Sequence, residues 1–126
     1  NATMGTRGGW GTEGGLRGQH LDYIRFNPEF RIVAYSPMLR GAYADPDRLE
    51  PAYRTEDNVK RKAALDAVAA EIGATPGQVV IAWMLASKPQ IIPLMAASTE
   101  AQLAENISGA QIKLTEDQMA RLDGAV

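Results

Sequence analysis

The stretch RIVAYSP, residues 31–37, has the composition of a short buried strand that ends at a proline. Ile32, Val33 and Tyr35 belong to the β-branched and aromatic residues that are enriched in strands. The stretch QIIPL, residues 90–94, has the same apolar character. The sequence therefore predicts two short buried strands separated by more than fifty residues.

Helix start signals dominate the second half of the chain. In a capping box, a Thr hydroxyl accepts a hydrogen bond from the third helical N–H, and a Gln at that third position reaches back to the Thr N–H. A further helix is predicted from about residue 59, with an apolar stripe and with Gly73 at its C-terminal cap. The pattern Thr-x-x-Gln that fits the capping box begins at Thr75, Thr99 and Thr115.

The remaining segments complete the predicted order of elements. A short helix from residue 19 should end before Pro28, because the residue before a proline avoids the helical region. Residues 41–58 contain Gly, two prolines and many charges, which predicts a long surface loop of the kind that often serves function. Strands that alternate with helices indicate an α/β fold with parallel strands.

Composition excludes several classes of function. The net charge is −2 and no basic patch occurs, so neither nucleic acid nor membrane is a predicted partner. There is no Cys and no apolar run long enough to span a bilayer, and we expect a cytoplasmic protein. Seven of the 12 glycines fall in residues 1–18. That segment lacks the context of a phosphate-binding loop, and it is predicted to be a flexible arm.

Four stretches in order resemble the aldo-keto reductases. VAYSPMLRG at residues 33–41 resembles their seventh barrel strand and its loop, and TPGQVVIAW at 75–83 resembles the start of their seventh helix. IPLMAAST at 92–99 resembles the eighth strand and its loop, and LTEDQMARLD at 114–123 resembles the extra C-terminal helix. The resemblance implies that residues 19–126 are the C-terminal part of a (β/α) TIM barrel: a partial barrel fragment, predominantly helical, with two short parallel strands.

The resemblance also implies a site for NADP or NAD. Tyr35 would stack on the nicotinamide ring, and Ser36, Met38 and Arg40 would line the path beside the pyrophosphate. The adenosine end would lie in the loop before the helix that Thr99 starts. The residues implied there are Ala97, Ser98, Thr99, Gln102, Glu105 and Asn106.

Each of these residues also has a simpler interpretation. Tyr35 can be a core residue, Ser98 and Thr99 can be helix caps, and the pair at 105–106 can be a solvated helix face. Where many family members place Lys or Arg for the 2′-phosphate, this chain has Ala96 and Gln102, so the choice between NADP and NAD stays open.

The resemblance implies no catalytic residue and no metal ligand in this chain. The family's Asp, Tyr, Lys and His set belongs to the first half of the barrel, and nothing in residues 1–30 resembles the segments that carry it. His20 is predicted to be a surface residue, and Tyr43 and Tyr53 lie in the long loop without a Lys–Asp pair to tune them. We therefore expect no carbonyl reduction by the chain alone.

Three hypotheses follow. The chain is the cofactor-binding part of a reductase, a truncated pseudoenzyme that acts as a binding or interaction module, or a repurposed oligomeric enzyme with Tyr43, Tyr53, Arg40 or His20 in new roles. Two strands leave unpaired edges and should expose Val33, Ile91 and Leu94. This predicts a homo-oligomer or a complementing polypeptide as partner, and a small carbonyl substrate only when the barrel is completed.

Overall fold

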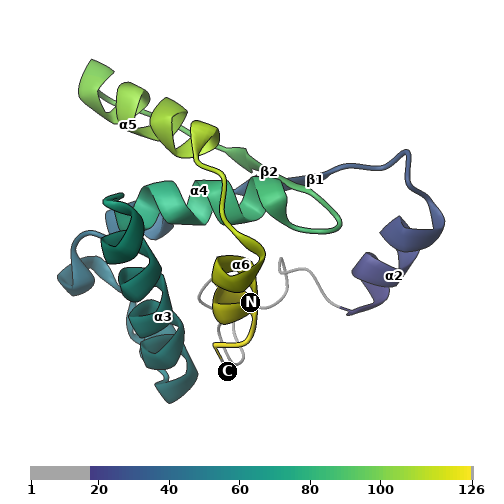
Figure 1. Cartoon of the computed structure of the whole chain (residues 1–126), viewed down its shortest axis with the longest axis horizontal. Coiled ribbons are helices and arrows are strands. Elements are labelled where there is room, and N and C mark those ends of the chain that lie inside the picture. Colours follow the sequence, from purple (N-terminus) through teal and green to yellow (C-terminus); the bar gives the residue numbers. More distant parts are fainter. Residues whose placement is uncertain (1–17, 126) are drawn as a thin grey trace.

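The computed structural model describes residues 18–125 and contains the predicted order of elements (Figure 1). The predicted glycine-rich arm lies outside the described residues, apart from Gly18, which begins the first helix. The helices and strands are α2 (Gly18–Phe26), β1 (Ile32–Tyr35), α3 (Glu56–Ile72), α4 (Pro76–Ala86), β2 (Ile91–Leu94), α5 (Glu100–Gln111) and α6 (Glu116–Asp123).

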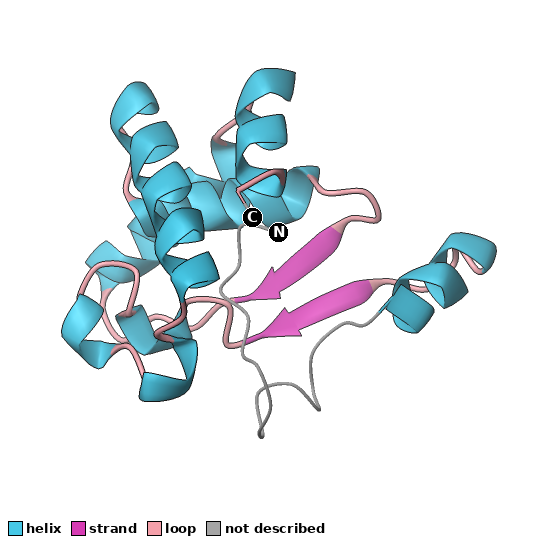
Figure 2. Cartoon of the chain, turned by 90° about the horizontal axis from the view of Figure 1, so that it is seen from below, coloured by secondary structure: helices cyan, strands magenta, loops and turns pink. Residues whose placement is uncertain are grey.

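The two strands pair in parallel, as predicted. Ile32 lies opposite Ile91 and Tyr35 lies opposite Leu94, so both strands end at the same level. Figure 2 shows the two arrows side by side and pointing the same way, with α2 beyond the start of β1. The predicted fold class is confirmed: the described residues are mostly helical and hold one two-stranded parallel sheet, which is not a closed barrel.

The prediction that both strands are buried is wrong for one of their faces. Side chains alternate between the faces of a strand, and Ile32 and Ile91 turn toward the core, Ile32 being only 6% exposed. The opposite face carries Val33, Ile92 and the strand ends, and nothing among the described residues covers it. Exposure was predicted for Ile91, but Ile92 is the exposed neighbour at 39%, because Ile91 lies on the covered face.

The helix starts follow their caps. Thr75 and Thr115 each form the complete capping box. Thr99 forms only half of a capping box. Its hydroxyl accepts a hydrogen bond from the Gln102 N–H at 3.2 Å, but the Gln102 side chain accepts from the N–H of Ser98 and not from that of Thr99. Helix α3 begins three residues earlier than predicted, because Thr55 supplies a further cap. Gly73 ends α3 in the left-handed conformation at φ 65°, as predicted.

The hydrophobic core lies where α3, α4 and α6 meet. Helix α4 is apolar on nearly every side, and Val79, Val80 and Trp83 are all at most 4% exposed. Leu65 from α3 and Leu122 from α6 are fully buried against them. Each such side chain contributes about 1.5–3 kcal/mol through burial.

The loop at residues 41–58 is not wholly a surface loop. It folds into three short 3₁₀ turns, at Leu39–Gly41, Pro46–Arg48 and Pro51–Tyr53. Tyr43 is only 4% exposed and belongs to the core cluster. Asn58, also buried, donates a 2.8 Å hydrogen bond to the Tyr53 carbonyl and closes the loop. Tyr43 and the neighbouring Ala42 are therefore buried in the core, although the polar composition of this segment predicted a surface loop.

No single helix among residues 18–125 is both long and apolar enough to cross a bilayer. Helices α3 and α4 reach that threshold only when joined, and they are bent 98° from one another.

Candidate cofactor site

The candidate site lies at the carboxyl ends of the two strands. Because β1 and β2 are parallel and in register to their last residues, the segments after Tyr35 and after Leu94 leave the sheet at one end (Figure 2). In parallel α/β folds this is the end where loops bind ligands. The sequence-predicted residues 35–40 and 97–99 therefore meet at a common end.

Tyr35 is not a core residue. Its side chain is 83% exposed on the uncovered face of the sheet, which leaves a flat apolar ring available to a ligand. The next residue, Ser36, is also exposed and has φ 51°.

The loop after β1 holds an unusual concentration of left-handed backbone. Ser36, Leu39 and Arg40 all have φ between 47° and 55° although none is glycine, and Gly41 follows at φ 90°. A non-glycine residue in this region costs of the order of 1–3 kcal/mol, and such residues cluster at functional sites. The rest of the loop holds this geometry, with Leu39 packed against the core.

The side chains of this loop point to different places. Arg40 is exposed, and its guanidinium lies 3.9 Å from the Glu50 carboxylate, a loose pair that leaves most of its donors open. Met38 instead packs against the core, with its sulfur beside Gly77 at the start of α4. Of the predicted pyrophosphate path, Ser36 and Arg40 are thus presented to solvent, while Met38 supports the loop from beneath.

The second loop ends at the N-terminus of α5. Ala97, Ser98 and Thr99 are exposed. The side-chain amide oxygen of Gln102, Oε1, accepts a hydrogen bond from the Ser98 N–H at 2.8 Å. The N–H groups of Glu100 and of the residue after it have no acceptor within the helix, because they belong to its first turn. Hydroxyls and free N–H groups at a positive helix end suit anionic or hydroxyl oxygens.

The two remaining predicted residues bind to the protein itself. The Glu105 carboxylate accepts a 2.7 Å hydrogen bond from the Thr75 hydroxyl, which turns it toward the start of α4. The Asn106 amide donates to the Ala96 carbonyl at 3.5 Å and so ties α5 to the loop after β2. Sequence reasoning did not find the partnership with Thr75, since nothing local in the sequence signals it.

Charge limits what this end of the molecule can hold. Neither Lys nor Arg occurs in residues 89–112, so Arg40 is the cation that the two loops contribute. The donor set fits ribose hydroxyls and a pyrophosphate. A 2′-phosphate would lack its charge-assisted partner here.

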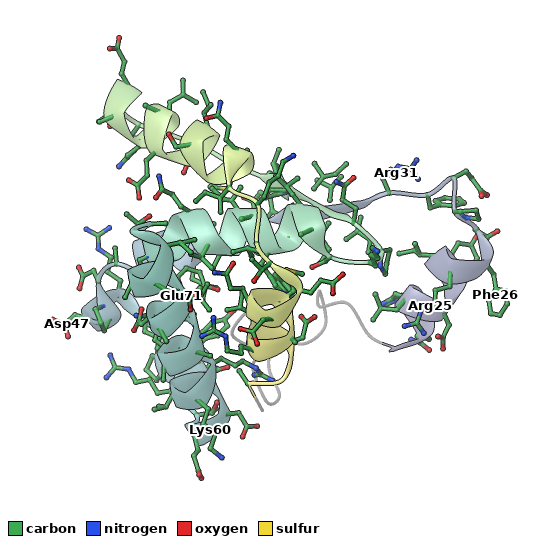
Figure 3. The ribbon with its side chains drawn as sticks, viewed as in Figure 1. Arg25, Phe26, Arg31, Asp47, Lys60 and Glu71 are labelled. Atoms are coloured by element: carbon green, nitrogen blue, oxygen red, sulfur yellow. The ribbon has the colours of Figure 1, made fainter. Side chains whose placement is uncertain are left out.

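An ion pair that joins two core helices lies away from this site. Arg121 on α6 binds the Glu71 carboxylate on α3 and, together with a 2.8 Å hydrogen bond from Gln118, holds the pKa of Glu71 below its ordinary value of 4.5. Figure 3 shows Glu71 on α3, far from α2 with its labelled Phe26. This pair fastens two core helices together and takes no part in the site.

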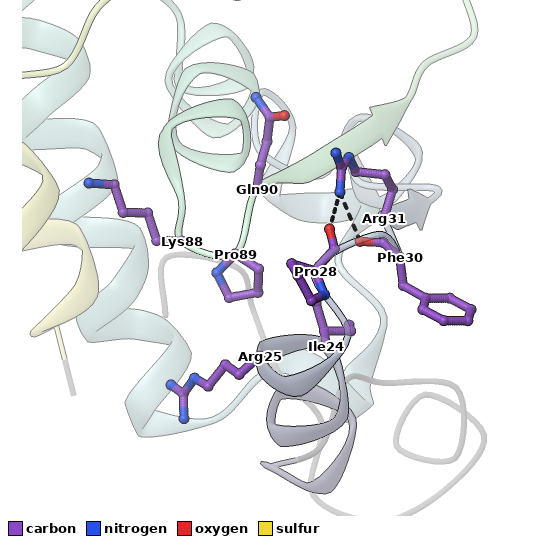
Figure 4. A pocket seen from close by; sticks show the side chains of 8 residues that line it. All are labelled: Ile24, Arg25, Pro28, Phe30, Arg31, Lys88, Pro89 and Gln90. Atoms are coloured by element: carbon purple, nitrogen blue, oxygen red, sulfur yellow. Dashed lines mark hydrogen bonds between the residues drawn. The ribbon is translucent and has the colours of Figure 1, made fainter.

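A cavity of about 480 Å³ lies at the other end of the strands, before β1 and β2 begin (Figure 4). Two of its three cations already have partners. Arg31 donates to the Pro28 and Phe30 carbonyls, and Arg25 pairs with Asp22 at 3.2 Å. The side chains that line it include Ile24, Arg25, Phe30, Arg31, Lys88 and Pro89.

Candidate acid–base residues are not gathered at the site. Tyr43 is buried in the core and Tyr53 packs against it, whereas Tyr35 is exposed on the uncovered face of the sheet. His20 is exposed on α2, beyond the opposite end of β1. Among residues 18–125, no group of three or more His, Asp or Glu side chains is placed to hold a metal ion.

The comparisons with known proteins agree with one another. The profile of the Aldo/keto reductase family matches residues 19–126. The chain is 39% identical over 104 residues to the aldo-keto reductase str7 of Strobilurus tenacellus, covering 71% of this chain and 31% of that protein. It is 31% identical over 100 residues to the aldo-keto reductase yakc [NADP(+)] of Schizosaccharomyces pombe, covering 68% and 29%.

A solved structure extends the match to the fold. The thermostable aldo-keto reductase Tm1743, crystallised with the inhibitor epalrestat, superposes with a TM-score of 0.64 at 33% identity. The match covers 85% of this chain and 33% of that one, so the chain spans about a third of the length of its relatives. The parallel strand pair, its two loops and the family match over residues 19–126 lead to one conclusion: the chain belongs to the aldo/keto reductase family.

Proposed function

We propose that this chain forms the cofactor-binding part of an NAD(P)H-dependent oxidoreductase that reduces a small carbonyl compound. The observation that carries the proposal is the parallel register of β1 and β2. In a member of this family, it brings the exposed Tyr35 and Ser36 to the same end as the Ser98–Thr99 loop. The reduced nicotinamide would supply a hydride to the carbonyl carbon.

Each group at this end has a role in binding. The exposed Tyr35 ring offers a flat surface for stacking, and Ser36 and Arg40 offer a hydroxyl and a guanidinium to the pyrophosphate. We assign the adenosine end to the exposed Ser98 and Thr99 and to the free N–H groups of the first turn of α5. The strained backbone from Ser36 to Arg40 aims these groups before a ligand arrives.

The chain's charges favour NADH over NADPH. A 2′-phosphate is a dianion, and residues 89–112 hold no cation to compensate it. Glu100 and Glu105 add negative charge to the same helix. The relative named for NADP(+) shows that the phosphorylated cofactor is used within the family, so this preference is a property proposed for this chain.

The proton for the substrate oxygen has to come from outside residues 18–125. Of the candidate proton donors, Tyr43 is buried in the core, Tyr53 packs against it and His20 lies on α2. We propose that the other strands of the barrel contribute that group, and that the chain by itself does not reduce carbonyls.

A fluorescence titration tests the proposal. The isolated chain is mixed with NADH and, separately, with NADPH, and carbonyl reduction is assayed in parallel. We expect NADH to bind and the substrate to remain unreduced. Tyr35→Ala should weaken NADH binding by roughly three- to tenfold, as expected for a lost stacking contact.

The outcomes separate the hypotheses. No binding of either cofactor contradicts the proposal and favours the second candidate function, a non-catalytic interaction module, which the uncovered face of the sheet supports. Turnover by the chain alone contradicts the assignment of the proton donor to another part of the barrel.

A further inference from the structure

The direction in which the Arg40 side chain leaves its loop is set by an unfavourable backbone conformation. Arg40 has φ 55° and Leu39 before it has φ 47°, both in the left-handed region that residues with a Cβ rarely adopt. Within this turn, the Gly41 N–H donates to the Met38 carbonyl at 2.9 Å. The Arg40 carbonyl takes its hydrogen bond from a side chain outside the turn. Contacts with the following segment therefore help to hold this geometry.

Arg48 makes that contact. Its Nη1 donates a long hydrogen bond of 3.5 Å to the Arg40 carbonyl, from eight residues further along the chain. The same Nη1 lies 3.5 Å from the point where a Cβ on Gly41 would stand, so the guanidinium packs over the left-handed Gly41. Arg48 thus touches two consecutive residues whose backbone decides where the Arg40 side chain points.

Asp45 holds Arg48 in this place. Its Oδ2 accepts from the Arg48 Nε at 3.1 Å, and its Oδ1 accepts from the Asp47 N–H at 3.2 Å, which caps the turn Pro46–Arg48. The Asp45 N–H donates to the Gly41 carbonyl at 3.1 Å. Asp45 therefore joins the turn that carries Arg48 to the turn that carries Arg40.

The two arginines use their donors differently. The Arg40 side chain is 88% exposed, and its pair with Glu50 at 3.9 Å leaves most of its N–H groups open to an anion. The Arg48 guanidinium is committed at Nε to Asp45 and at Nη1 to the Arg40 carbonyl. The rigid fork of a guanidinium suits it to hold two acceptors at fixed positions. Arg40 is thus placed to bind a ligand, and Arg48 to hold Arg40.

We propose that Arg48, held by Asp45, is a positioning residue for the cofactor: it fixes the Arg40 backbone so that the Arg40 guanidinium meets the pyrophosphate. Arg48 itself does not touch the cofactor. The proposal rests on the proposed function, which assigns Arg40 to the pyrophosphate. Without Arg48, the left-handed turn loses a support, and ordering Arg40 again on binding costs affinity.

NADH titration of the full chain at low ionic strength tests the role of Arg48. We expect Arg48→Ala to weaken NADH binding by roughly three- to fivefold, a modest loss because its contacts are partly exposed. Arg54→Ala is the matched control, since Arg54 lies in the same segment and its Nε also donates to a backbone carbonyl, that of Leu49 at 3.1 Å. The control removes the same charge and should change the affinity by less than about twofold. An equal loss in both variants would assign the effect to charge alone and overturn the proposal.

A double-mutant cycle with Arg40 separates positioning from direct contact. If Arg48 acts through Arg40, then adding Arg48→Ala to Arg40→Ala should weaken NADH binding no further. Losses that multiply in the double variant would mean that Arg48 binds the cofactor by itself, and the positioning role would be wrong.

Asp45→Asn gives a result whose sign distinguishes positioning from simple electrostatics. Loss of a carboxylate near an anionic cofactor should tighten binding if charge alone matters. Asn still caps the turn but holds the Arg48 guanidinium less strongly, so positioning predicts binding weaker by about twofold. Asp47→Asn is the control, because Asp47 belongs to the same turn and points away from the molecule in Figure 3. Its affinity should equal or slightly exceed that of the parent, and tighter binding by Asp45→Asn contradicts the proposal.

Hydrogen exchange without cofactor provides an independent measurement. The Gly41 amide should exchange several-fold faster in Arg48→Ala than in the parent or in Arg54→Ala, while the amides of α4 stay unchanged. Equal exchange of Gly41 in all three overturns the proposal whether or not a cofactor binds. A parent chain that binds neither cofactor contradicts the proposed function. A parent that binds NADH no better than Arg48→Ala contradicts only the role of Arg48.

Discussion

The hydroxyl of Thr75 lies 2.7 Å from the Glu105 carboxylate, joining the start of α4 to the middle of α5 across thirty residues. The same hydroxyl accepts the N–H of Gln78, and the Gln78 side chain donates to the Glu105 carbonyl at 3.3 Å. The residue that the family resemblance assigns to the cofactor therefore completes a helix cap. If Glu105 serves the cap, its loss should lower stability, and if it binds cofactor, its loss should lower cofactor affinity.

Glu105→Ala should lower the free energy of unfolding by about 1 kcal/mol, the usual net value of one hydrogen bond. Glu105→Gln should retain most of that stability, because its amide oxygen can accept from the Thr75 hydroxyl. Urea denaturation measures both. If capping is the main role, NADH affinity changes less than twofold in either variant. A large loss of affinity with unchanged stability would instead return Glu105 to the cofactor site.

Gly109→Ala should destabilise the chain by about 1–3 kcal/mol, although alanine is the better helix former. A Cβ at Gly109 would lie 2.9 Å from the Gln78 Cα, so α5 could not stay in contact with α4. Gly77→Ala is the control, since its Cβ would meet the Met38 sulfur at an ordinary 3.5 Å. Equal denaturation midpoints for the two variants would contradict this close helix contact.

Glu71 should make stability depend on pH in the acid range. Its pKa is lowered by hydrogen bonds from Arg121 and Gln118, so its stabilising effect is complete above the unfolded value near 4.5. The effect is lost as the pH falls through the lower pKa of the folded state. Denaturation midpoints of the parent and Glu71→Gln should therefore differ at pH 7 and converge toward pH 3. A difference that is constant with pH would contradict the pairing. Both side chains are over 40% exposed, so added salt should reduce the difference.

Gln102→Arg should shift cofactor preference toward NADPH by about tenfold relative to NADH, the value of one charge-assisted hydrogen bond. The substitution frees the Ser98 N–H and places a guanidinium at the start of α5, where no cation now lies. Gln102→Met separates the two effects, because it also frees the Ser98 N–H but adds no charge. Parallel titrations give the ratio of the two affinities. The same shift in Gln102→Met would show that charge is not the cause.

The sequence by itself determined the elements and the family. Threonine caps, a left-handed glycine and two apolar runs act over a few residues, so their outcome does not depend on distant neighbours. One of these local predictions was wrong in detail. The Gln102 side chain accepts from the N–H of Ser98, whereas the capping box requires the N–H of the adjacent Thr99.

Only the tertiary structure decided which surfaces those elements cover. Tyr43 is buried in the core, and Glu105 accepts a hydrogen bond from Thr75. Val33 is exposed, whereas Ile91 packs against the core. None of these outcomes has a local signal, because each depends on which element occupies the space beside it. Burial and long-range hydrogen bonds arise only when elements pack together. Among the described residues, that packing surrounds α4 but leaves one face of the two-stranded sheet uncovered.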